Sequence, residues 1–184
     1  MSRIGNLPIE IPAGVTVTVD NNNVVKVKGP LGELDQKVSK DIKVEIKDNE
    51  VVFSRTSDEK QYKALHGLSR ALVHNMILGV SKGFVIQQEL VGVGFRAEAK
   101  GQKLEMSLGY SHDIIMELPP EVKVETKTER RANPIITLRS TNKQLLGHVA
   151  AKIRSLRPPE PYKGAGIKFV NEQLRRKAGK AASV

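Results

Sequence analysis

The sequence predicts an α+β fold of two similar domains, each a small, mostly antiparallel sheet packed on one helix. The first observation is the order of patterns: several short strand patterns precede one amphipathic helix, and this order occurs twice. The second is local similarity: residues 42–45 (IKVE) resemble residues 122–125 (VKVE), 80 positions later, and Gly67 and Gly147 share this separation. These observations favour an internal duplication over two unrelated α+β domains.

Alternating apolar and polar residues predict the strands of the first half. Valines at every second position of residues 15–19 are typical of a half-buried strand, and the asparagine-rich segment after them predicts a turn. Residues 42–46 and 51–53 flank an Asp-Asn turn, which is typical of a hairpin. Gly29-Pro30-Leu31-Gly32 is expected to end a strand. The predicted strands are residues 15–19, 24–28, 42–46 and 51–53.

The first helix is predicted from apolar residues at helical spacing. These residues include Leu65, Leu68 and Leu72, and the pattern continues to Met76 and Ile77. We expect Asp58 to cap the helix at its N-terminus and Gly79 to end it.

The second half repeats the order of strands followed by a helix. Thr141 is expected to cap this helix, and the Pro158-Pro159 pair ends it. The predicted strands are residues 85–91, 95–99, 104–108, 114–118, 122–124 and 134–138. We therefore predict an N-terminal α+β domain at residues 1–82, a C-terminal α+β domain at residues 83–170, and a basic tail at residues 171–184.

Composition excludes several classes of protein. The chain of 184 residues is 39% hydrophobic and has no apolar run near the roughly 18 residues that span a bilayer. The N-terminus lacks the apolar core of a secretory signal, so we expect a cytoplasmic protein. Cysteine is absent, which excludes disulfides, thiolate catalysis and cysteine metal sites.

The positive charge is concentrated at the C-terminal end. Residues 1–129 hold 17 Lys+Arg and 18 Asp+Glu, whereas residues 130–184 hold 13 Lys+Arg and only two acids, Glu160 and Glu172. Such asymmetry favours a polyanionic partner, either nucleic acid through counterion release or an anionic membrane surface. A solvated tail that aids solubility is the simpler alternative.

Catalytic and membrane functions are disfavoured. The chain has no nucleophile elbow, Walker loop or zincin motif, and Gly92-Val93-Gly94 is typical of a turn rather than a nucleotide loop. The four histidines lack metal-ligand spacing, so we expect no catalytic residue, metal, cofactor or small-molecule substrate. A peripheral membrane protein needs bulky apolar anchors on a basic helix, and residues 171–184 offer only Leu174.

A Pro- and Gly-rich stretch after the second helix has the chemistry of a nucleic-acid contact. Arg154 and Arg157 are three apart on the last helical turn, and three prolines within four positions then stiffen the backbone. Gly164 and Gly166 allow close approach to a ligand, and Lys163 and Lys168 flank them. Tyr162 either stacks on a base or packs. The alternative is a linker that closes the second domain.

Two further basic segments belong to the candidate interface. Arg175, Arg176, Lys177 and Lys180 lie in the tail among small residues, a composition typical of a segment that phosphate contact orders. Arg130 and Arg131 are added for their charge, in a loop that precedes a strand.

The segment 159–168 (PEPYKGAGIK) resembles the signature of the bacterial large-subunit ribosomal protein L-six family. The opening residues 1–9 (MSRIGNLPI) and residues 27–32 (VKGPLG) also resemble this family, and the resemblance covers essentially the whole chain. The family pattern has lysine where this chain has Ala165, so one phosphate contact is expected to be absent.

The resemblance implies a non-catalytic structural component of the large ribosomal subunit, with two domains from an ancient duplication. It implies binding of 23S rRNA through the second domain, near the sarcin–ricin loop at the base of the stalk, where translational GTPases act. The first domain would face solvent and neighbouring ribosomal proteins, and the protein would be ribosome-bound in the cytoplasm. The predicted rRNA-binding residues are Arg130, Arg131, Arg154, Arg157, Tyr162, Lys163, Gly164, Gly166, Lys168, Arg175, Arg176, Lys177 and Lys180.

Overall fold

The computed structural model describes residues 3–47, 49–129 and 132–179. Three predicted contact residues, Arg130, Arg131 and Lys180, lie outside this range. The described residues form two compact units. Unit 1 runs to Phe84 and includes Thr141–Lys143, and unit 2 comprises the remainder. The boundary at residues 82 and 83 stays a prediction.

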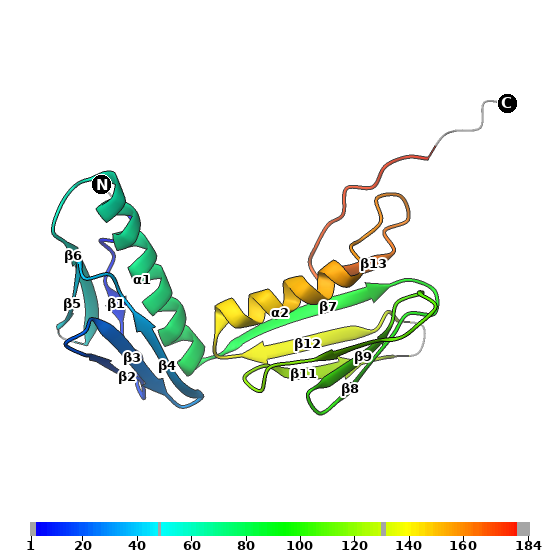
Figure 1. Cartoon of the computed structure of the whole chain (residues 1–184), viewed down its shortest axis with the longest axis horizontal. Helices are drawn as coiled ribbons and strands as arrows, with labels where there is room; N and C mark the ends of the chain where they lie inside the picture. Colours follow the sequence, from blue (N-terminus) through cyan, green and yellow to red (C-terminus); the bar gives the residue numbers. More distant parts are fainter. Residues whose placement is uncertain (1–2, 48, 130–131, 180–184) are drawn as a thin grey trace. The chain divides into compact units, whose positions relative to one another are not determined.

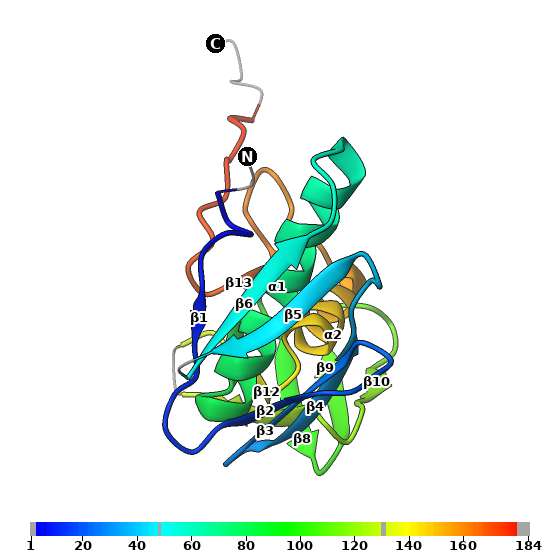
Figure 2. The same ribbon diagram turned by 90° about the vertical axis from the view of Figure 1, so that its left-hand side faces the viewer.

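Unit 1 contains two three-stranded antiparallel sheets and the helix α1 (Lys60–Ser81). One sheet has the order β1-β6-β5 and the other β2-β3-β4. Figure 2 shows β5 and β6 in front of α1, so this sheet covers one side of the helix. The strands are β1 (Ile9–Glu10), β2 (Thr16–Val19), β3 (Val24–Gly29), β4 (Gly32–Lys37), β5 (Ile42–Lys47) and β6 (Glu50–Arg55).

The alternation predicted from the sequence builds the core of unit 1. Val25 and Val27 of β3, two positions apart, are fully buried, as is Val51 of β6. On α1, Val73 and Ile77 are four apart and pack into the same core. Burying one aliphatic side chain of this size contributes about 1.5–3 kcal/mol. The packing of these side chains between α1 and the strands is therefore the main source of stability in unit 1.

The ends of α1 differ from the predicted ones. The residue at the N-cap position is Glu59, which forms no side-chain cap, and Asp58 pairs with Arg55 at 2.8 Å instead. The helix continues past Gly79 to Ser81, and Gly83, two residues further on, has a φ of 74° and donates to the carbonyls of Leu78 and Gly79. Gly79 is needed for space, because a Cβ there would overlap the carbonyl oxygen of Thr141.

Unit 2 repeats this arrangement with a four-stranded and a three-stranded sheet. The four-stranded sheet has the order β11-β12-β7-β13, and helix α2 (Lys143–Leu156) lies along it in Figure 1. The second sheet, β10-β9-β8, is antiparallel. The strands are β7 (Phe84–Val91), β8 (Arg96–Lys100), β9 (Lys103–Ser107), β10 (Ile114–Glu117), β11 (Lys123–Lys127), β12 (Ile135–Ser140) and β13 (Gly166–Phe169).

The core of unit 2 lies between α2 and the four-stranded sheet. Leu146 and Ile153 of α2 are fully buried, as is Leu90 of β7. Gln88 of β7 is also fully buried, and its side-chain amide donates to the carbonyl of Ala150 at 2.8 Å. This bond offsets part of the cost of burying an amide and ties the helix to the central strand.

The observed elements confirm the predicted α+β class with small antiparallel sheets, although three strands were not predicted. β4 has one apolar side chain, Leu34, and lies at a sheet edge, where charged residues are tolerated and alternation is weak. β1 has only two residues. β13 begins inside the glycine-rich stretch and pairs antiparallel with β7, Ile167 opposite Leu90.

Candidate nucleic-acid interface

Residues 157–165, here called the Pro-Gly loop, connect α2 to β13, and hydrogen bonds join the two ends of this loop. Two backbone bonds close it: Ile167 N–H donates to the carbonyl of Arg157, and Glu160 N–H donates to that of Ala165, both at 2.8 Å. Gly166, with a φ of 144°, packs against the prolines, since a Cβ there would lie 2.6 Å from the carbonyl oxygen of Pro158. The loop is therefore held in one shape.

The basic tail, residues 171–184, returns to this loop over its described part. Lys177 N–H donates to the carbonyl of Pro161 at 2.8 Å. Gly164 has a φ of 76° and lies against the tail, since the position of a Cβ there is 3.4 Å from Arg176 Nε, an ordinary van der Waals contact. Loop and tail project from the same end of unit 2 in Figure 1 and form one surface, here called the loop–tail surface.

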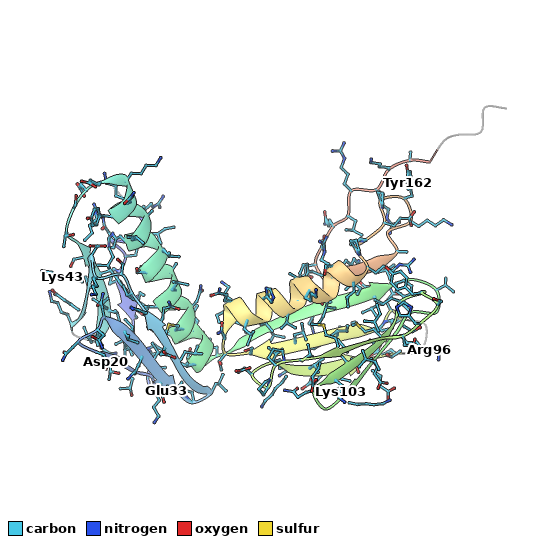
Figure 3. All side chains as sticks on the ribbon, in the orientation of Figure 1. Asp20, Glu33, Lys43, Arg96, Lys103 and Tyr162 are labelled. Atoms are coloured by element: carbon cyan, nitrogen blue, oxygen red, sulfur yellow. The ribbon has the colours of Figure 1, made fainter. Side chains whose placement is uncertain are left out.

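The loop–tail surface carries five of the predicted contact residues as exposed side chains. Tyr162 is 53% exposed and extends from the outer part of the loop in Figure 3. Four cations accompany it within two short stretches of chain. The exposed residues are Tyr162, Lys163, Arg175, Arg176 and Lys177.

Two other predicted contacts have their charges paired inside unit 2. Arg154 Nη2 lies 2.6 Å from Glu172 Oε1, and Lys168 Nζ lies 3.1 Å from Glu89 Oε2. Lys168 stands in β13 rather than in a loop, and its side chain is only 23% exposed. These two cations stabilise unit 2 and are poor candidates for direct phosphate contact.

Burial and hydrogen bonding act in opposite directions on Glu172. Burial raises the pKa of its carboxyl, but the Phe169 N–H at 3.1 Å and the Arg154 guanidinium outweigh burial and hold the pKa below its usual range. A carboxyl whose pKa is lowered by folding stabilises the fold above its unfolded pKa, and this contribution is lost as pH falls through the folded pKa.

Glu172→Gln is expected to destabilise the chain at pH 7 by about 1–2 kcal/mol, because it replaces a charge-assisted contact by a neutral one. The difference from wild type should shrink as pH falls below about 4.3, where the unfolded carboxyl is protonated. Urea denaturation at pH 7, 5 and 3.5 measures this. Glu117→Gln, at an exposed position on β10, is the control. A difference independent of pH would reject the ion pair as its source.

Arg157 is the centre of a cluster that sequence reasoning missed. Its guanidinium carbon lies 5.2 Å from the centre of the Phe95 ring and 4.9 Å from that of Tyr110, and Nη1 donates to the carbonyl of Leu108. Tyr110 is 47% exposed and stacks on His112 with ring centres 6.2 Å apart. Only the Gly-Tyr turn signal between two predicted strands could have drawn attention to this cluster.

The described residues give no support to other kinds of site. No three His, Asp or Glu side chains among them lie close enough together to hold a metal ion. Within the same residues, no helix is long and apolar enough to cross a membrane.

Comparison with known proteins identifies the family. A sequence model described as ribosomal protein L6 matches residues 11–83 and 91–170, two repeated regions that confirm the predicted duplication. Large ribosomal subunit protein uL6 of Parabacteroides distasonis is 59% identical over 182 residues, covering 99% of both chains. The protein of that name from Bacteroides fragilis is 58% identical over 187 residues (99% of this chain, 98% of the relative), and that from Flavobacterium psychrophilum is 57% identical over 182 residues (99% and 100%). The chain belongs to the ribosomal protein L6 family.

Proposed function

We propose that the chain is a structural, non-catalytic component of the large ribosomal subunit that binds 23S rRNA through unit 2. We place its contact near the sarcin–ricin loop at the base of the stalk, beside the neighbouring large-subunit proteins and the site of translational GTPases. The protein acts ribosome-bound in the cytoplasm. Membership of the ribosomal protein L6 family supports this role, as do the matched regions and the relatives' printed names.

The observation that carries the RNA-binding proposal is the loop–tail surface. It presents four exposed cations on a backbone that prolines and hydrogen bonds hold in shape. Each cation that neutralises a phosphate releases a counterion, and the stiff loop lowers the entropy lost on docking. Folded RNA is recognised largely through its shape and backbone, which suits such a surface.

The aromatic cluster extends the interface beyond charge. Tyr110 OH donates to the carbonyl of Leu156 at 3.0 Å, which fixes the ring beside the start of the Pro-Gly loop. The Tyr110–His112 pair can stack on an unpaired base, a contact worth about 1–3 kcal/mol.

Replacing the loop–tail cations is expected to weaken rRNA binding and to reduce its salt dependence, because phosphate contacts are lost. The triple variant Lys163→Gln, Arg175→Gln, Lys177→Gln should reduce the slope of log K against log salt by about 2–3, at 0.7–0.9 per lost phosphate contact. The probe is a 23S rRNA fragment containing the sarcin–ricin loop, with a scrambled RNA of equal length, between about 50 and 200 mM salt.

The matched control removes equal charge from the strands of unit 2, at Arg96, Lys103 and Lys123. Figure 3 shows Arg96 and Lys103 well away from Tyr162. We expect this control to keep the wild-type slope. Equal slopes for the two triple variants would reject the loop–tail surface as the contact. Equal affinity of the wild type for both RNAs would reject specific rRNA recognition.

A further inference from the structure

Helix α1 of unit 1 carries an asymmetric distribution of charge. Its 22 residues include no Asp or Glu. Lys60, Lys63, Arg70 and His74, together with Gly67, follow each other at spacings of three and four, which places them along one flank of the helix. Because 14 residues rise about 21 Å, this flank is a basic stripe rather than a single charge.

Neighbouring segments extend the basic stripe. Arg70 donates to the carbonyls of Leu7 and Pro8 at 3.2 and 3.3 Å, which holds the N-terminal segment beside α1. The exposed Arg3 belongs to that segment. At the other end of the stripe, Lys143 Nζ donates to Asn75 Oδ1 at 3.3 Å.

The charge on this flank is not balanced locally. Within the described residues, Lys60, Arg70 and Lys143 form no ion pair. Burial lowers the pKa of His74, and the charges of Arg70 and Lys143 lower it further, as expected where positive charges converge.

Apart from Asp58 and Glu59, which directly precede the helix, the described acids of unit 1 lie on its strands and turns. Asp58 pairs with Arg55 at 2.8 Å, although Lys63 also lowers the pKa of its carboxyl. Asp20 and Glu33 lie on the strand side of the unit in Figure 3. Residues 1–82 hold 12 Lys+Arg and 10 Asp+Glu, a nearly neutral sum. This sum averages over the faces of the unit, since α1 carries three of the cations and no acid.

We propose that the basic stripe, Lys60, Lys63, Arg70, His74 and Lys143, is a second phosphate-binding surface that contacts the backbone of a double-helical segment of the same rRNA. This inference rests on the proposed function. Small residues, Gly67 and Ala71, lie among the cations and let a phosphate backbone come close. Contacts to the RNA backbone require positive charge and a surface that fits it, but no groups that read the bases. The stripe offers this charge and this surface. Unit 1 is thus an RNA-binding module in its own right rather than a solvent-facing domain.

The test compares two charge-matched variants of the full chain. Lys60→Gln, Lys63→Gln removes part of the stripe but leaves Arg70, which holds the N-terminal segment. Lys37→Gln, Lys43→Gln removes the same charge from exposed strand positions, Lys43 being labelled in Figure 3. Binding to full-length 23S rRNA is measured from about 50 to 200 mM salt. The stripe variant should lower the salt slope by about 1.4–1.8, and the strand variant should leave it unchanged.

Hydroxyl-radical footprinting of the same complexes separates the two RNA contacts. The stripe variant should lose rRNA protections that the Lys163, Arg175 and Lys177 variant keeps. An unchanged slope and footprint for the stripe variant, with wild-type binding intact, would overturn this inference and would favour an acidic protein as the partner of α1. Failure of the proposed function would instead appear as equal wild-type affinity for scrambled RNA.

Discussion

Gly166→Ala is expected to destabilise unit 2 by about 3 kcal/mol, the largest effect of any single methyl group in the loop–tail region. Gly166 has a φ of 144°, which side chains rarely adopt. An added Cβ would lie 2.6 Å from the carbonyl oxygen of Pro158 and 2.7 Å from Pro159 Cα. Both are backbone atoms of a proline pair, so neither can move without shifting the Pro-Gly loop.

Gly147→Ala, in α2 of the same unit, is the matched comparison. Nothing lies within 4 Å of the position of its Cβ, so the added methyl group meets no neighbour. Alanine favours a helix over glycine by about 1 kcal/mol, and this variant should therefore be more stable than wild type. Urea denaturation followed by circular dichroism measures both changes.

The consequence for binding follows from the position of Gly166. Tyr162 and Lys163 lie a few residues before it in the chain. The hydrogen bond between Glu160 and Ala165 closes the loop just before Gly166. Displacing the prolines would disturb that closure. Gly166→Ala should therefore weaken binding to the 23S rRNA fragment even where the chain remains folded. A variant as stable as wild type would show that the proline pair yields, and that the loop is less rigid than its packing indicates.

Most of the strands and both helices could be predicted because the spacing of apolar residues, which is a local pattern, determines them. The alternation of β2, β3, β5 and β6 is visible in the sequence since one face of each strand meets the core. β4 was not predicted, because a strand at the edge of a sheet needs no apolar face. β13 was not predicted, because it pairs with β7, whose residues are far away in the chain, and no local pattern indicates such a pairing.

The candidate interface was predictable only in part, for a similar reason. Charge is a property of composition, so the sequence could single out Lys163 and the cations of the tail, which are exposed over the described residues, while their contact with RNA stays a prediction. Whether a cation is paired depends on the fold: Lys168 meets Glu89 only when β13 joins β7. The basic stripe on α1 was missed because the net charge of a whole segment averages over its faces.

Arg157→Ala is expected to cost about 2–3 kcal/mol of stability and to leave the salt slope of rRNA binding unchanged. The guanidinium lies over the rings of Phe95 and Tyr110, and cation–π contacts contribute about 0.5–2 kcal/mol each. Its removal also leaves the carbonyl of the fully buried Leu108 without its donor, at a cost of about 1–3 kcal/mol. These contributions overlap, since the same side chain makes all three contacts.

The test separates a structural arginine from a phosphate ligand. Arg157→Lys keeps the charge but lacks the planar group that lies over both rings, so it should recover little of the lost stability. If Arg157 contacts phosphate instead, Arg157→Ala should lower the slope by about 0.7–0.9 and Arg157→Lys should restore it. The geometry favours the first result. The guanidinium faces two rings and a carbonyl of its own unit, so we expect the proposed phosphate contacts to come from Lys163, Arg175, Arg176 and Lys177 instead.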